Sequence, residues 1–219
     1  MNRISPRFVL LALPLALLLA TSVPAAAQEP WRIKALGGVN SADADVTANL
    51  RGLSVETTAK SSYSVGLGLD ARCSETFITR VEVLYTVRET DMTYSGGGLP
   101  PFDATYEATQ LDMPVTVKAQ FGKGVFRPFL AAGLVFSYLL SAEETGTQQG
   151  FTQTFDIEDQ LNGAGLAATA GLGFDLRVGD QIWLSLEGRY NYGLTNWAGS
   201  GDEMKTRDLQ GLASVGYDF

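Results

Sequence analysis

Charged residues of both signs stand at alternate positions within segments that are otherwise apolar. One small residue separates Asp70 from Arg72, and Arg80 and Glu82 are spaced in the same way. Alternate residues of a β-strand share one face, so each segment would carry its charges on a single face. The set comprises Asp70, Arg72, Arg80, Glu82, Arg88, Asp112, Lys118, Asp175, Arg177, Glu187 and Arg189. Such charges can line an ion path, or they can pair with one another into a buried network.

Catalysis by these residues is not expected. The chain has no histidine, so the imidazole base that usually activates serine or water near neutral pH is missing. Tuned carboxylates can act as bases instead, but no pair of carboxylates stands in a recognisable catalytic frame. We therefore predict no catalytic residue and no enzyme activity.

Metal ions, cofactors and nucleic acids are not expected as ligands either. Acidic pairs such as Glu143 and Glu144 offer the oxygen ligands that calcium prefers, yet none follows an EF-hand pattern. The GxG sequences lie inside apolar alternating segments and indicate strand packing, not phosphate loops. A net charge of −8 disfavours nucleic acid as a partner.

The N-terminus has the features of a secretory signal peptide. Arg3 and Arg7 precede an apolar run, residues 8–20, that is too short to span a bilayer, and three alanines at 25–27 offer a cleavage site. We predict a signal peptide at 1–27 and a single β-barrel domain at 28–219. The one cysteine, Cys73, cannot form an internal disulfide.

Alternating segments of about ten residues recur along the predicted domain, the length at which a tilted strand crosses a membrane. We identify eight, at residues 31–39, 62–72, 76–88, 110–121, 126–140, 166–177, 182–192 and 209–219. Pro114 and Pro128 each remove a ladder donor, so we expect them at bulges or near strand ends.

The connections between these segments alternate in length. Tight turns are expected at 73–75, 122–124 and 178–180, and long links at about 40–61, 89–105, 141–160 and 195–206. Short turns on one side and long loops on the other are typical of outer-membrane barrels. The predicted fold is an all-β, eight-stranded antiparallel up-and-down transmembrane β-barrel in the outer membrane of a Gram-negative bacterium, with both termini in the periplasm.

Aromatic residues support this prediction. The chain ends LASVGYDF, and a strand that closes on Tyr217 and Phe219 is a membrane-insertion signal read by the barrel-assembly machinery. Other aromatics gather near segment ends and form expected interfacial girdles, although Trp183 points inward in this register. The girdle residues are Trp31, Phe77, Phe121, Phe126, Trp183, Tyr217 and Phe219 on one side and Tyr63, Tyr106, Tyr138, Tyr192 and Trp197 on the other.

Three stretches resemble the PorT-type outer-membrane β-barrel family, within the broader OmpA/OmpX-like eight-stranded class. They are residues 114–144, residues 186–196 and the terminal LASVGYDF. The resemblance implies an eight-stranded barrel with periplasmic termini. Some members of that family are linked to protein secretion and gliding, so the resemblance makes such components candidate partners.

The expected function is a non-enzymatic structural, adhesion or secretion-associated role carried by the extracellular loops. A narrow porin or small-solute channel is the alternative. Known enzymatic outer-membrane barrels rely on a histidine base, which this chain lacks. An eight-stranded barrel is just wide enough for side chains to fill, which favours a charge network over a conducting pore. Outer-membrane lipid and lipopolysaccharide are the expected surroundings. In one predicted loop, Phe151, Phe155 and Ile157 either anchor a partner or fold back over the barrel mouth, and we expect the second.

Overall fold

Eight strands close into a barrel in the computed structural model of this chain, which describes residues 31–47, 53–96, 99–148, 151–157, 161–196 and 203–219. The predicted signal peptide at 1–27 lies outside these residues, as does Trp197. Across the described part of the chain, no helix combines the length and the apolar character needed to cross a bilayer.

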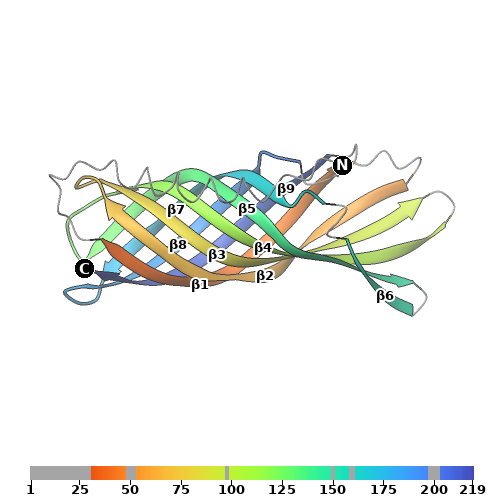
Figure 1. Ribbon diagram of the computed structural model, residues 1–219, viewed down its shortest axis with the longest axis horizontal. Helices are drawn as coiled ribbons and strands as arrows, with labels where there is room; N and C mark the ends of the chain where they lie inside the picture. Colours follow the sequence, from red (N-terminus) through yellow and green to blue (C-terminus); the bar gives the residue numbers. More distant parts are fainter. Residues whose placement is uncertain (1–30, 48–52, 97–98, 149–150, 158–160, 197–202) are drawn as a thin grey trace.

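Each barrel strand pairs antiparallel with its neighbours, and β1 pairs with β9 to close the ring (Figure 1). The barrel strands are β1 (Arg32–Thr47), β2 (Leu53–Arg72), β3 (Phe77–Gly96), β4 (Leu99–Gln120), β5 (Phe126–Gln148), β7 (Ala164–Arg177), β8 (Ile182–Gly193) and β9 (Glu203–Asp218). A short ninth strand, β6 (Phe151–Asp156), pairs only with the far end of β5. Closure leaves no unpaired strand edge in the ring, and the predicted fold class is confirmed.

Alternation along each strand separates a polar inside from an apolar outside. On β8, Glu187 and Arg189 are buried, whereas Leu186 and Tyr190 are exposed. The same division runs around the ring, where exposed apolar side chains include Ile33, Val65, Leu67, Val117, Leu130, Leu134, Leu172, Leu184 and Val215. An apolar surface of this extent is not stable in water, and it is the surface that a lipid-embedded barrel requires.

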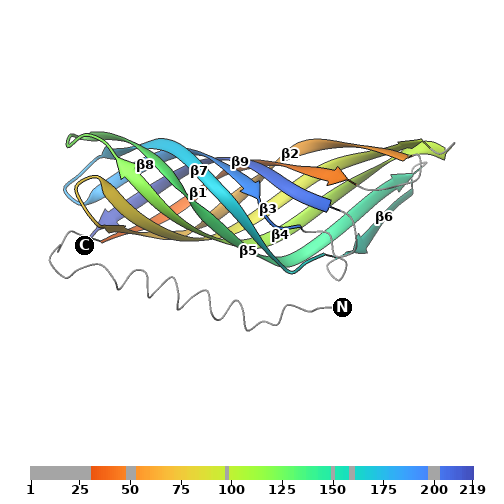
Figure 2. The same cartoon turned by 90° about the horizontal axis from the view of Figure 1, so that it is seen from above.

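The two ends of the barrel differ. At the turn end, residues 73–76, 121–125 and 178–181 join successive strands, which confirms the three predicted turns. The Phe219 amide donates to the Trp31 carbonyl at 2.9 Å, so the beginning and the end of the described chain meet at this end. At the opposite end, which we call the hairpin end, β2, β3, β4 and the β5–β6 hairpin extend well past the body of the barrel (Figures 1 and 2).

The predicted long links are wrong for most of their length. Residues 53–61, 89–96 and 99–105 are strand, and residues 141–148 continue β5. Pairing between β3 and β4 continues to Tyr94↔Phe102 and, after a register shift, to Gly96↔Leu99. It thus extends past the strand segments whose outward side chains are apolar. These segments have polar side chains on both faces, so they lack the alternation from which strands were predicted.

The two prolines lie in different settings. Pro128 is near the start of β5, as expected. Pro114 lies inside β4 and not at a bulge: pairing with β3 runs to Val81↔Val115 and resumes at Leu84↔Asp112 in the same register. Because proline has no N–H, the ladder is interrupted there without a shift.

Most described girdle aromatics are exposed, including Trp31, Phe77, Tyr63 and Phe219. Trp183 is one exception, because it is only 3% exposed and lies inside the barrel. Tyr106 also departs from the prediction and packs against a small cluster of Leu139, Ala142 and Ile157. Ile157 thus folds back, as expected, but Phe155 on β6 stays 54% exposed.

Candidate functional site

The inside of the barrel holds a network of ion pairs that spans opposite walls. Arg80 on β3 contacts Asp70 on β2 at 3.1 Å and Glu187 on β8 at 2.5 Å. Lys34 on β1 contacts Glu82 at 2.6 Å and Asp70 at 3.2 Å. Each of these side chains is at most 7% exposed. We call this group, completed by Arg189, the central cluster.

Arg189 joins Glu187 on β8 to Glu82 on β3 within the central cluster. Its Nε donates to Glu187 at 3.0 Å, and its Nη1 lies 2.8 Å from Glu82. The second contact is a charge pair without hydrogen-bond geometry. Buried charges are costly unless they are paired, so the mixed signs predicted on the inner face have a structural explanation.

Asp175 on β7 is a second node of the network. Its carboxylate accepts from Lys118 at 2.6 Å, from Gln120 at 2.6 Å and from Ser185, and Arg32 lies at 3.2 Å. Lys118 and Asp175 are both fully buried. The Lys118 ammonium also lies 3.9 Å from the centre of the Phe129 ring, an inward aromatic that adds a cation–π contact.

A third group lies towards the hairpin end. Arg88 donates to Asp112 at 2.8 Å and to Asp208 at 2.9 Å, joining β3 with β4 and β9. Between this group and the central cluster, Leu36, Leu84 and Leu212 form a buried apolar contact inside the barrel. Side chains therefore fill the lumen in successive polar, apolar and polar layers, as expected for a barrel of eight strands.

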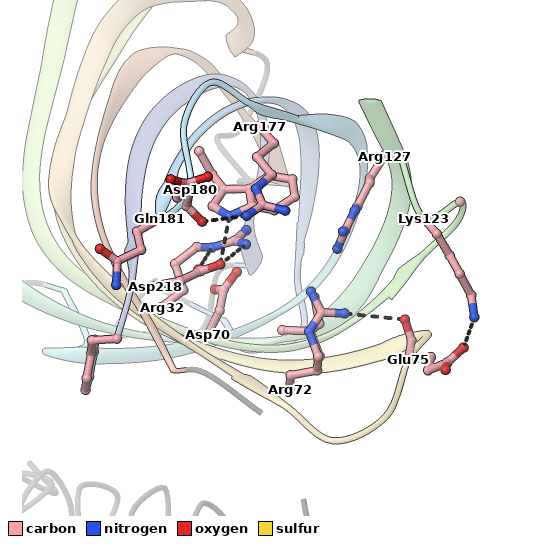
Figure 3. Close-up of a pocket in the computed structure, with 14 residues that line it drawn as sticks. Arg32, Asp70, Arg72, Glu75, Lys123, Arg127, Arg177, Asp180, Gln181 and Asp218 are labelled. Carbon is pink, nitrogen blue, oxygen red and sulfur yellow. Dashed lines mark hydrogen bonds and ion pairs between the residues drawn. The ribbon is translucent and has the colours of Figure 1, made fainter. Parts of the chain in front are cut away.

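A cavity of about 630 Å³ opens at the turn end (Figure 3). Trp183 lines this cavity and donates its indole N–H to Asp218 at 2.7 Å. Arg32 also holds Asp218, at 2.6 Å, and its guanidinium stacks 4.4 Å from the Trp183 ring centre. Arg127 and Arg177 line the same cavity, which we call the turn-end mouth.

The residues predicted to face the inside of the barrel lie either in the lumen or at the turn-end mouth. Asp70, Arg80, Glu82, Arg88, Asp112, Lys118, Asp175, Glu187 and Arg189 are buried in the lumen. Arg72 and Arg177 lie at the mouth instead, where Arg72 donates to Gln120 at 3.2 Å. Tyr217 and Phe219 are exposed on the outer surface of the turn end, and their role in insertion stays a prediction.

Three network members were not predicted from the sequence. Arg32 and Lys34 alternate with the outward residues Trp31 and Ile33, so the same pattern could have identified them. Asp208 lies just before the predicted eighth segment, whereas β9 begins at Glu203. Within the described residues, no group of three or more acidic or cysteine side chains is arranged to hold a metal ion.

The chain is similar in sequence and in structure to known outer-membrane proteins. The sequence model of a family described as the outer membrane protein beta-barrel domain matches residues 26–199. The match stops short of β9, which the structure shows pairing with β8 and β1. No curated protein matches the chain.

Solved structures of outer-membrane proteins resemble this chain at low sequence identity. The outer membrane protein OprG from Pseudomonas aeruginosa is 14% identical, with a TM-score of 0.53 over 87% of this chain and 97% of that one. Neisserial surface protein A is also 14% identical, with a TM-score of 0.43 over 86% of this chain and 97% of that one. At 14% identity the likeness to OprG concerns the fold alone.

Proposed function

This chain belongs to the outer membrane protein beta-barrel domain family, and from that premise we propose that it is a non-enzymatic barrel with a closed lumen and a binding surface at its hairpin end. The binding surface serves a structural, adhesion or secretion-associated role. The turn end, with both termini of the domain, faces the periplasm, and the hairpin end faces the exterior. Outer-membrane lipid and lipopolysaccharide surround the barrel.

The closed lumen carries this proposal. Lys118, Arg80 and Glu82 come from two adjacent strands, are at most 1% exposed, and pair with groups on β1, β2, β7 and β8. An ion path through this layer would have to break pairs in a low-dielectric interior, where an unpaired charge is costly. The alternative, a narrow small-solute channel, has support only from the turn-end mouth, which is open at one end of the barrel.

The hairpin end presents exposed polar residues on paired strands. The β5–β6 hairpin pairs from Glu143↔Asp156 to Gln148↔Phe151, and residues 152–156 are exposed. Phe155 adds an exposed aromatic side chain to this otherwise polar edge. Aromatic side chains surrounded by polar residues are typical of protein contact surfaces.

Photo-crosslinking in cells tests the binding surface. A crosslinking residue at Thr154 on the β5–β6 hairpin should give a discrete adduct with a protein of the envelope or cell surface. The matched control is Leu172, which is 65% exposed on the lipid-facing wall and should give no such adduct. Identical products from both positions would contradict a binding role for this hairpin. Liposome swelling with small sugars addresses the alternative, and we expect none.

The insertion signal has its own test. Deleting Phe219 should leave most of the protein unassembled, because the assembly machinery would lose the terminal aromatic it recognises. Phe126→Ala is the control, since Phe126 is a similarly exposed aromatic of the turn end. The folded fraction is measured by the mobility difference between unboiled and boiled samples on denaturing gels. Equal folded fractions in the two variants would show that Phe219 does not act as an insertion signal.

A further inference from the structure

We propose that the turn-end mouth is a binding site for a phosphate group, held between Arg127 and Arg177 with Arg72 beside them. Nothing in the proposed function requires this site. The three arginines come from the ends of β5, β7 and β2 and extend toward one opening (Figure 3). The cavity that they line, about 630 Å³, is large enough for a small phosphate ester.

Two further cations of the mouth, Arg32 and Lys123, have carboxylate partners. Arg32 is held by Asp218 and Asp175. Lys123 is held by Glu75 at 2.6 Å. Asp70, which also lines the cavity, is held from within by Lys34 and Arg80. These pairs occupy the carboxylates of Asp218, Asp70 and Glu75 and leave Arg127 and Arg177 without neutralisation.

Arg127 and Arg177 contact only neutral acceptors. Arg127 donates to the Gly124 carbonyl at 3.1 Å and to the Gln120 amide oxygen at 3.5 Å. Arg177 donates to the Gly179 carbonyl at 3.0 Å and to the Asp180 carbonyl at 2.7 Å. Among the described residues, no carboxylate forms an ion pair with either guanidinium, and the Asp180 side chain is exposed at the rim. A guanidinium has five N–H donors, so each retains donors for a ligand.

Trp183 brings the positive charges together. The guanidinium carbons of Arg32, Arg127 and Arg177 lie 4.4, 4.7 and 5.9 Å from the centre of its ring. Contact with an aromatic face attracts each cation, but like charges gathered around one ring repel one another. An anion between Arg127 and Arg177 would relieve that repulsion. The planar donors of arginine match the oxygens of phosphate in a bidentate manner.

Titration of the mature barrel, refolded in uncharged detergent, tests the site. Isothermal calorimetry with glycerol 3-phosphate at constant ionic strength should show saturable binding. Arg127→Gln and Arg177→Gln should each weaken binding about tenfold or more, as expected for loss of a charge-assisted hydrogen bond. Lys123→Gln is the matched control, because it removes a positive charge of the same rim that already has a carboxylate partner, and its affinity should stay within about twofold.

Several outcomes would overturn the proposal. They are the absence of saturable binding up to about 10 mM phosphate ester, equal weakening in all three variants, and equally strong binding of succinate, which would indicate a carboxylate site. Gel mobility confirms that each variant is folded. Nanodiscs distinguish the source of the phosphate: competition by phosphatidylglycerol and not by phosphatidylcholine supports a lipid headgroup as the natural ligand, and the absence of competition supports a soluble phosphate ester.

Discussion

Lys118→Met lowers the free energy of unfolding of the barrel by about 3 kcal/mol, the range expected when one partner of a buried ion pair is removed. Lys118 is fully buried and lies 2.6 Å from Asp175. Methionine fills a similar volume without the charge. The lost stability therefore measures the cost of leaving the charged Asp175 carboxylate without its lysine partner. Equilibrium unfolding in urea, followed by tryptophan fluorescence of the barrel in lipid vesicles, measures the change.

Lys123→Met is the matched control for this experiment. Lys123 also forms a 2.6 Å pair with a carboxylate, that of Glu75, but the two side chains are 82% and 73% exposed. The hydrogen bond from Lys123 and its positive charge hold the pKa of the Glu75 carboxyl below its usual range. Exposed ion pairs contribute little to stability because solvent screens them, so the control should unfold almost as the parent does. Equal losses in the two variants would mean that the lumen network is hydrated and does not stabilise the barrel.

Gly66→Ala should destabilise the barrel by about 3 kcal/mol or more, because an added methyl group has no space there. A Cβ at Gly66 would lie 2.0 Å from the Val83 carbonyl oxygen on the neighbouring strand and 2.9 Å from the Leu84 side chain. The first of these atoms belongs to the backbone, so β2 and β3 would have to separate to admit it.

Gly188→Ala is the control for Gly66→Ala. Gly188 lies on the exposed face of β8, and a Cβ there would meet no atom within 4 Å. Alanine at this position should be neutral or slightly stabilising, since glycine loses more backbone entropy on folding. The folded fraction on unboiled gels and the urea midpoint compare the two variants. If Gly66→Ala unfolds at the midpoint of Gly188→Ala, close approach of β2 and β3 is not required.

The sequence predicts the barrel body well because lipid and lumen impose opposite demands on alternate residues. Glu187 and Arg189 alternate with Leu186 and Tyr190, and that pattern alone assigns their faces. Beyond the lipid, both faces of a strand meet water and the constraint disappears. Residues 53–61 and 89–96 therefore looked like loops although they are strands.

The partners within the lumen could not be predicted in the same way. Arg80 and Glu187 are 107 residues apart in the chain, and their contact depends on the tilt and stagger of strands that do not pair with each other. The turn-end mouth was missed for a related reason. The guanidinium groups of Arg127 and Arg177 converge on the Trp183 ring, and this convergence requires the closed ring of strands.

Single-channel recording in planar bilayers tests the central claim that the lumen is closed by its ion pairs. The refolded protein should give no steady unitary current over a range of voltages. Its gel mobility after reconstitution into lipid vesicles shows that it inserts in the folded state. Lys118→Met should produce brief, irregular openings, because the Asp175 node of the network loses its buried lysine. Large, steady and reproducible unitary currents from the unmodified barrel would contradict the account and favour a channel.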